Sequence, residues 1–118
     1  MEAAGRYPAA LAAYRAALER WPDATTVRLG IGNVQYRGGN LAAAADEFAK
    51  LLTIDPAHAV ARNNLAQVLL ERGQPEGALR EITAARASLR DARFAPLLEK
   101  TEAEIRRVLA TDAPARNP

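Results

Sequence analysis

The sequence predicts an all-α fold built as an antiparallel helical-hairpin solenoid, with about two and a half repeats and a C-terminal capping helix. Hydrophobic residues make up 49% of the 118 residues, but only 5% are aromatic. Alanine occurs throughout, and it is both the best helix former and small enough to let helix backbones approach closely. Runs of β-branched and aromatic residues that would indicate strands are missing. At this length we expect a single domain.

An internal period of 34 residues supports this fold class. A shift of 34 residues places Gly5 on Gly39 and Gly39 on Gly73. Periods of this length are typical of helical-hairpin repeats, in which each unit buries its apolar face against its neighbours. The same shift also aligns Ala10, Ala44 and Ala78; Tyr14, Phe48 and Ile82; Ala17, Leu51 and Ala85; and Pro22 and Pro56.

The first complete repeat, residues 25–58, reads as two helices joined by a glycine turn. Apolar residues at helical spacing predict a helix over 25–37 and a second helix over 41–53. Gly39 between them can supply the positive φ that ends a helix. Pro56 closes the repeat, because the residue before a proline resists the α conformation.

The second complete repeat, residues 59–92, follows the same plan. It predicts helices over 59–71 and 75–88 on either side of Gly73. A proline at residue 75 suits the start of a helix, where its missing N–H is not needed. Asp23 and Asp55 are the predicted N-terminal caps of the helices that follow them.

The two ends of the predicted domain, residues 1–110, differ from these repeats. Residues 5–24 form a half repeat with one helix, since Gly5 aligns with the turn glycines. Residues 93–110 predict an amphipathic capping helix that begins at Phe94, of the kind that covers the last apolar face of a solenoid. Residues 111–118 contain proline and few apolar residues, and we expect a disordered tail there.

The helix of the half repeat, predicted over 7–20, lacks a hairpin partner. We therefore expect its apolar face to be exposed unless an upstream segment or a second copy of the chain covers it. This leaves two alternative functions open: an accessory domain of a larger protein whose catalytic region lies upstream, or a module that self-associates into a homo-oligomer. The residues of this face are Tyr7, Leu11, Tyr14 and Leu18.

Small and apolar residues recur at fixed places in both complete repeats. They are Ile31, Gly32, Gly39, Ala44, Phe48, Leu51 and Pro56, and then Leu65, Ala66, Gly73, Ala78, Ile82 and Ala85. This signature resembles the tetratricopeptide repeat (TPR) family over residues 5–92. The sequence departs from it at Arg28 and Arg62, where the family usually has tryptophan, and at Arg90, which replaces the closing proline. An atypical last repeat is expected in a solenoid.

The resemblance implies a protein-interaction module. In this family the first helix of each hairpin lines a concave groove that holds an extended peptide or a helix of a partner protein. Asn33 and Asn64 match the asparagines with which peptide-binding members hold a ligand's backbone, because an amide both donates and accepts hydrogen bonds. The alternative is that the two amides only link neighbouring helices. The groove residues mapped by register are Asn33, Tyr36, Arg37, Asn64, Gln67 and Glu71.

Some members of the family clamp a C-terminal carboxylate with lysines and an arginine. The matching positions here hold Leu29, Phe94 and Leu98. The resemblance therefore predicts no carboxylate clamp, and an apolar surface near the capping helix.

The sequence offers no catalytic or metal-binding constellation, so we expect neither an enzyme nor a cofactor. His58 is the only histidine, predicted in an exposed loop, and Ser88 is the only serine. A nucleophile needs a base beside it, and metal sites need clustered ligands. Gly30 and Gly32 superficially suggest a dinucleotide loop, but no strand precedes them. We expect these glycines to allow close helix packing instead.

Charge and hydropathy exclude two further classes of partner. The net charge is +2, and basic and acidic residues are interspersed, which predicts no nucleic-acid binding. No apolar run approaches the roughly 20 residues of a membrane span, so membrane insertion is not expected. No signal peptide is visible, which favours a cytoplasmic location.

Overall fold

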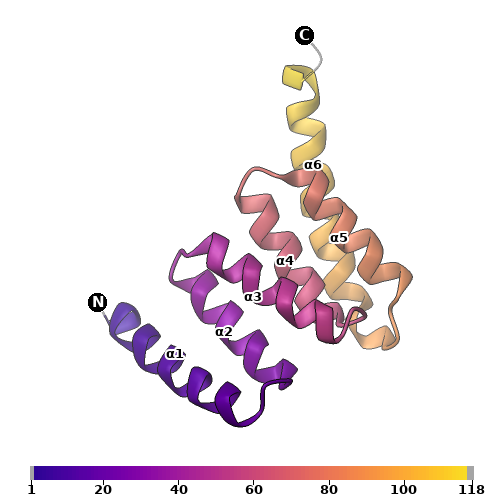
Figure 1. The fold of residues 1–118 in the computed structure, drawn as a ribbon. Helices are drawn as coiled ribbons and strands as arrows, with labels where there is room; N and C mark the ends of the chain where they lie inside the picture. The colour runs from indigo at the N-terminus through magenta and orange to yellow at the C-terminus, as the bar shows by residue number, and fades with distance from the viewer. Residues whose placement is uncertain (1, 117–118) are drawn as a thin grey trace. The chain divides into compact units, whose positions relative to one another are not determined.

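The computed structural model describes the backbone of residues 2–116 and the side chains of residues 7–111. This part of the chain contains six α-helices, one short 3₁₀ helix and no strand (Figure 1), which confirms the predicted all-α class and its helical hairpins. The elements are α1 (Glu2–Arg20), α2 (Thr25–Arg37), α3 (Leu41–Ile54), α4 (Ala59–Glu71), α5 (Pro75–Ala87), η1 (Ala92–Phe94) and α6 (Ala95–Arg116).

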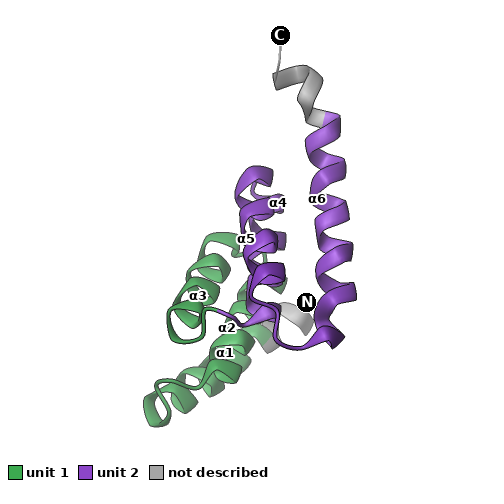
Figure 2. Ribbon diagram, turned by 90° about the vertical axis from the view of Figure 1, so that its right-hand side faces the viewer, with its two compact units in different colours: residues 1–56 green, residues 57–118 purple. Residues whose placement is uncertain are grey.

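The helices fall into two compact units, residues 1–56 and residues 57–118 (Figure 2). In unit 1, α2 and α3 form a hairpin and α1 packs against α2. In unit 2, α4 and α5 form the equivalent hairpin, and α6 packs against both of its helices. Each complete repeat of the sequence thus corresponds to one hairpin.

Both hairpins turn through the same glycine motif. Gly39 has φ 82° and Gly73 has φ 77°, a conformation that glycine adopts without strain. In the first turn, the N–H of Asn40 donates to the carbonyl of Gln35 at 2.8 Å; in the second, the N–H of Gln74 donates to the carbonyl of Leu69 at 2.9 Å. These six-to-one bonds satisfy carbonyls that a helix end leaves open. The predicted glycine turns are confirmed.

The N-terminal caps differ from the prediction. The residues that cap α2 and α4 are Ala24 and His58. Asp23 and Asp55 lie one and three positions too early in the chain to occupy the cap. His58 is half-buried, and its Nδ1 accepts a hydrogen bond from the N–H of Ala61 at 3.1 Å. The prediction of an exposed loop histidine is therefore wrong, because the side chain satisfies a donor of the first helical turn.

Helix α1 also begins earlier than predicted. Its backbone is helical from Glu2 and continues through Gly5, so the turn expected from the alignment of Gly5 with Gly39 is absent. A glycine inside a helix costs only about 1 kcal/mol relative to alanine and does not by itself end a helix. The half repeat is therefore a single 19-residue helix.

The C-terminal helix differs from the prediction at both ends. Residues 92–94 form a 3₁₀ turn whose N-terminal residue, Asp91, accepts a hydrogen bond from the N–H of Arg93, so α6 begins one residue after Phe94. At its other end α6 continues to Arg116, which contradicts the expected disorder for residues 111–116. The hydroxyl of Thr111 donates to the carbonyl of Arg107 at 2.9 Å, one turn earlier in the helix. Residues 117–118 of the predicted tail lie outside the described residues.

The cores of the two units contain the residues of the repeat signature. In unit 1, Ile31, Ala44, Phe48 and Leu51 are fully buried. In unit 2, the buried cluster consists of Ala66, Ala78, Ile82, Ala85, Leu98 and Ile105, the last two from α6. The capping role predicted for the C-terminal segment is met by these two side chains, which cover the apolar face of the α4–α5 hairpin.

Candidate protein-binding surface

Three of the predicted groove residues share one face of α2 in unit 1. Asn33, Tyr36 and Arg37 are spaced i, i+3, i+4, which places their side chains next to one another on a helix. Asn33 and Tyr36 are half-buried, and Arg37 is exposed in the last turn. This face therefore combines an amide, a phenol and a guanidinium within about one helical turn.

The other three share one face of α4 in unit 2. Asn64, Gln67 and Glu71 are spaced i, i+3, i+7; the first two are half-buried and Glu71 is exposed. The Oδ1 of Asn64 accepts a hydrogen bond from Nδ2 of Asn63 at 3.4 Å. Asn63 itself is only 2% exposed. The hydrogen bond therefore links the side chain of Asn64 to a buried amide. Each trio thus forms a continuous polar face on its own helix.

Two positions of one trio correspond to two positions of the other at the 34-residue period. Asn33 and Gln67 are equivalent positions, so both hairpins present an amide one turn before the end of the first helix. Arg37 and Glu71 are also equivalent, and they place opposite charges at the ends of α2 and α4.

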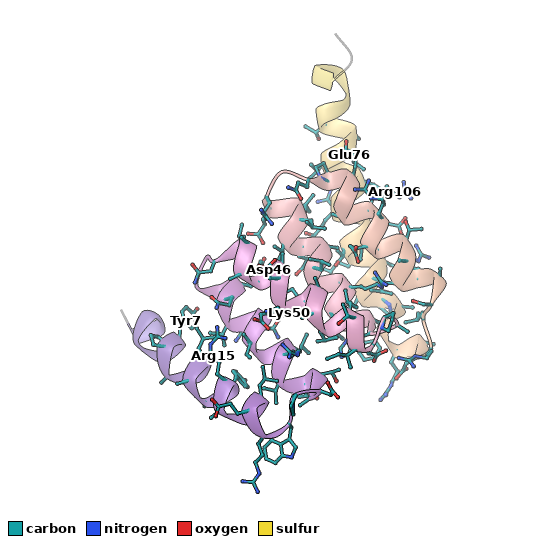
Figure 3. All side chains as sticks on the ribbon, viewed as in Figure 1. Tyr7, Arg15, Asp46, Lys50, Glu76 and Arg106 are labelled. Atoms are coloured by element: carbon teal, nitrogen blue, oxygen red, sulfur yellow. The ribbon has the colours of Figure 1, made fainter. Side chains whose placement is uncertain are left out.

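The predicted N-terminal patch is turned toward α2 rather than exposed. Tyr7, Leu11, Tyr14 and Leu18 are all half-buried. A Cβ on Gly30 would lie 2.6 Å from Cζ of Tyr14, and one on Gly38 would lie 3.3 Å from Cδ2 of Tyr7. Figure 3 shows Tyr7 near the N-terminal end of α1, on the side toward α2. The expectation of an exposed face is wrong because α2 packs against it. The expectation that Gly30 allows close helix packing is confirmed.

Comparisons with known proteins identify this arrangement. Two family models, each described as tetratricopeptide repeat, match residues 2–59 and 35–101. The chain belongs to the tetratricopeptide repeat family. A comparison with curated protein sequences finds no match.

Solved TPR structures have the same fold. The TPR2B domain of yeast Sti1, in its complex with pHsp70, superposes with a TM-score of 0.80 at 17% identity, covering 87% of this chain and 85% of that one. The type III secretion translocator chaperone SycD of Yersinia enterocolitica gives 0.82 at 16% identity, covering 93% and 77%. At such identities the likeness shows the fold alone.

The positions of the TPR carboxylate clamp are apolar, as the sequence indicates. Leu98 is fully buried in the core of unit 2, in the cluster that holds Ile82. Leu29 and Phe94 are half-buried. A buried leucine cannot be replaced by an exposed cation without rebuilding the contact between α5 and α6.

An ion pair stands at the usual TPR tryptophan position in both hairpins. Nη1 of Arg28 lies 3.6 Å from Oε1 of Glu47, and Nη1 of Arg62 lies 2.7 Å from Oε1 of Glu81. Sequence reasoning noted the arginines but missed the glutamates. The signal was present, since Glu47 and Glu81 are also 34 residues apart. In each hairpin the pair joins the first helix to the second.

The first of these pairs is the more buried. Glu47 is 8% exposed, and its Oε2 also lies 3.8 Å from Nζ of Lys50. Nη2 of Arg28 donates to the carbonyl of Pro22 at 3.3 Å. Nε of Arg28 and Oε1 of Glu47 are buried without a hydrogen bond of their own. For these two atoms, only the attraction between the charges compensates for part of the lost solvation.

A second charged cluster joins α5 to α6. Glu102 accepts hydrogen bonds from Arg86 and from Nε of Arg106, the latter at 2.8 Å. These bonds, from Arg86 first and then from Arg106, hold the pKa of the Glu102 carboxyl below its usual value. A carboxylate held ionised in this way anchors the capping helix.

The part of the chain that the structure describes lacks two further kinds of site. No group of three or more histidine, cysteine or acidic side chains there is placed to hold a metal ion. No helix there has both the length and the apolar character needed to cross a membrane.

Proposed function

We propose that this TPR chain binds a peptide or helical segment of a partner protein through the polar faces of α2 and α4. The observation that carries the proposal is the repeated amide, Asn33 on α2 and Gln67 on α4, in a chain of this family. TPR modules typically act in protein interactions, and the Sti1 domain named above is in complex with pHsp70. SycD, the second structure named above, is a type III secretion translocator chaperone.

The chemistry of the two faces indicates how such a ligand would be held. An amide side chain can donate to a ligand carbonyl and accept from a ligand N–H, so it recognises backbone rather than sequence. Arg37 and Glu71 would add selection for an acidic residue near α2 and a basic residue near α4. Because Leu98 fills the clamp position, the ligand is not selected by a terminal carboxylate.

A peptide selection tests this function. A displayed library of peptides is selected against the whole chain, and the affinity of a selected peptide is measured by titration calorimetry. Replacing both repeated amides, Asn33→Ala with Gln67→Ala, is expected to weaken binding at least about tenfold, which corresponds to about 1.4 kcal/mol.

Asn40→Ala is the matched control. Asn40 is exposed at the start of α3, where its amide bonds to Oε1 of Gln35, and it lies on neither proposed face. It should leave the affinity unchanged. Equal affinity of the wild type and the double variant, with the helical circular-dichroism signal intact, would refute binding through these faces.

A further inference from the structure

The two proposed binding faces differ at their first position. Asn64, with which the α4 face begins, falls on Gly30 of α2 under the 34-residue shift. Gly30 stands three residues before Asn33 and seven before Arg37, a spacing that puts it on the same face of α2. Where α4 presents an amide side chain, α2 therefore presents bare backbone.

The phenol of Tyr14 occupies the space that a side chain at residue 30 would need. A Cβ on Gly30 would lie 2.6 Å from Cζ, 2.7 Å from Cε1 and 2.9 Å from the hydroxyl oxygen of Tyr14. The end of the ring thus rests directly on the backbone of α2. Since Tyr14 belongs to α1, a neighbouring helix brings a polar atom to the place where the α4 face has the side chain of Asn64.

Tyr14 also differs from its equivalents in the two complete repeats. The 34-residue shift places Tyr14 on Phe48 and then on Ile82. Phe48 and Ile82 carry no polar side-chain atom, and both are fully buried. Tyr14 carries a hydroxyl and is only half-buried. Its side chain therefore does more than fill the interior of a helix pair.

We propose that Tyr14 is a further ligand-binding residue of the α2 face, and that its hydroxyl takes the place of the amide that Asn64 provides on α4. This inference rests on the proposed function. The ligand group is a backbone carbonyl or N–H of the bound segment, because a phenol hydroxyl both donates and accepts hydrogen bonds. The ligand is then contacted by α1 as well as by α2 and α4.

Packing holds the ring of Tyr14 in place before a ligand arrives. Tyr7, two turns earlier on α1, reaches the other end of α2, where a Cβ on Gly38 would lie 3.3 Å from its Cδ2. Two tyrosines thus fix α1 along the stretch of α2 that contains Asn33. A tyrosine has only two side-chain torsions, and a ring already held by packing loses little conformational entropy on binding.

Tyr14→Phe tests the role of the hydroxyl. The affinity for a peptide selected against the whole chain is expected to fall about three- to tenfold, the loss of one uncharged hydrogen bond. The midpoint of urea unfolding should not change, because the ring keeps its contact with Gly30. Tyr7→Phe is the matched control. It removes the same atom from the same helix, but beside Gly38 rather than Gly30, and should leave the affinity unchanged.

A transfer of the polar group from α1 to α2 gives a second test. Tyr14→Ala removes the hydroxyl and frees the space over residue 30. Adding Gly30→Asn then copies the arrangement of α4, and the double variant should bind the peptide about three- to tenfold more tightly than Tyr14→Ala alone. Circular dichroism checks that both variants keep their helices.

Three results would overturn the role of Tyr14: a Tyr14→Phe variant that binds as tightly as the wild type, an equal loss in Tyr7→Phe, or no gain from Gly30→Asn. Failure of the proposed function gives a different result, since the variant with Asn33→Ala and Gln67→Ala would then bind as tightly as the wild type. If that variant loses affinity and Tyr14→Phe does not, the α2 and α4 faces bind the ligand without Tyr14.

Discussion

The hairpins α2–α3 and α4–α5 have the same register but fill their interiors differently. In the first, the ring of Phe48 occupies the space that a Cβ on Gly32 would need. In the second, the equivalent residues are Ile82 and Ala66, both fully buried. The larger side chain on the second helix requires the smaller residue on the first. The repeat therefore conserves the combined volume of the pair rather than either residue, as close packing demands.

The ion pairs that join the two helices of each hairpin differ in a parallel way. Arg28 and Glu47 are 3.6 Å apart with a 10% exposed carboxylate side chain, whereas Arg62 and Glu81 are 2.7 Å apart with a 25% exposed one. In the first pair the charged atoms are farther apart and the carboxylate is less accessible to water. In the second pair they are closer together and the carboxylate is more accessible. The same two residue types at the same positions should therefore contribute differently to stability.

The largest effect that separates the two hairpins is expected from Gly32→Ala. The new methyl group would overlap the ring of Phe48, so the free energy of unfolding should fall by about 2–3 kcal/mol. Adding Phe48→Ile, which copies the second hairpin, should recover much of this loss. Urea unfolding followed by circular dichroism measures both changes. A Gly32→Ala variant as stable as the wild type would contradict the packing described here.

The turn glycines should respond alike in the two hairpins. Gly39 and Gly73 both have positive φ, and a Cβ at either would meet nothing within 4 Å. Gly39→Ala and Gly73→Ala should therefore each cost about 1–2 kcal/mol through backbone strain alone. Thermal unfolding compares them. Costs that differ by more than about 1 kcal/mol would show that the two turns are not equivalent.

Neutralising the glutamates tests the difference between the ion pairs. Glu47→Gln leaves the half-buried Arg28 without an opposite charge beside it and should cost about 1–2 kcal/mol. Glu81→Gln should cost less, at most about 1 kcal/mol, because water reaches that pair more readily. Denaturant unfolding of the two variants gives the ranking. The reverse ranking would mean that the distance between the charges matters more than their burial.

The smallest effect concerns pH and the anchor of α6. The folded pKa of Glu102 is lowered, so its stabilisation is fully present above the usual glutamate pKa and is lost as the pH falls through the folded value. Solvent screening limits this contribution to at most about 0.5 kcal/mol. Stability measured from pH 7 down to pH 3 should fall slightly less in Glu102→Gln than in the wild type. If stability falls equally in the wild type and in Glu102→Gln, the Glu102 carboxylate does not anchor α6.

The sequence predicted the hairpins well because their signals are local and repeat. The bounds of α2 and α4 agree with the prediction, and Gly39 and Gly73 end helices because only the backbone conformation matters there. Gly5 aligns with these two glycines at the 34-residue period, but no helix ends there. A glycine permits a turn but does not force one, and α1 continues through it.

The proposed binding faces and the contacts around them were only partly predictable from the sequence. Helical spacing places Asn33 beside Tyr36, and Asn64 beside Gln67, without any tertiary information. The burial of Tyr14 against Gly30 required knowing that α1 packs against α2. The pairing of Arg28 with Glu47 likewise depends on how α2 and α3 meet, since 19 residues separate the charges along the chain.

The most direct test of the central claim, that the α2 and α4 faces bind a partner, is a nuclear magnetic resonance titration. The labelled chain is titrated with a selected peptide, and the side-chain amide signals of asparagine and glutamine are followed. We expect the side-chain amide signals of Asn33, Asn64 and Gln67 to shift until the peptide saturates the chain. The signal of Asn40 should not shift. Saturable shifts at Asn40 alone, with the three others unchanged, would contradict it.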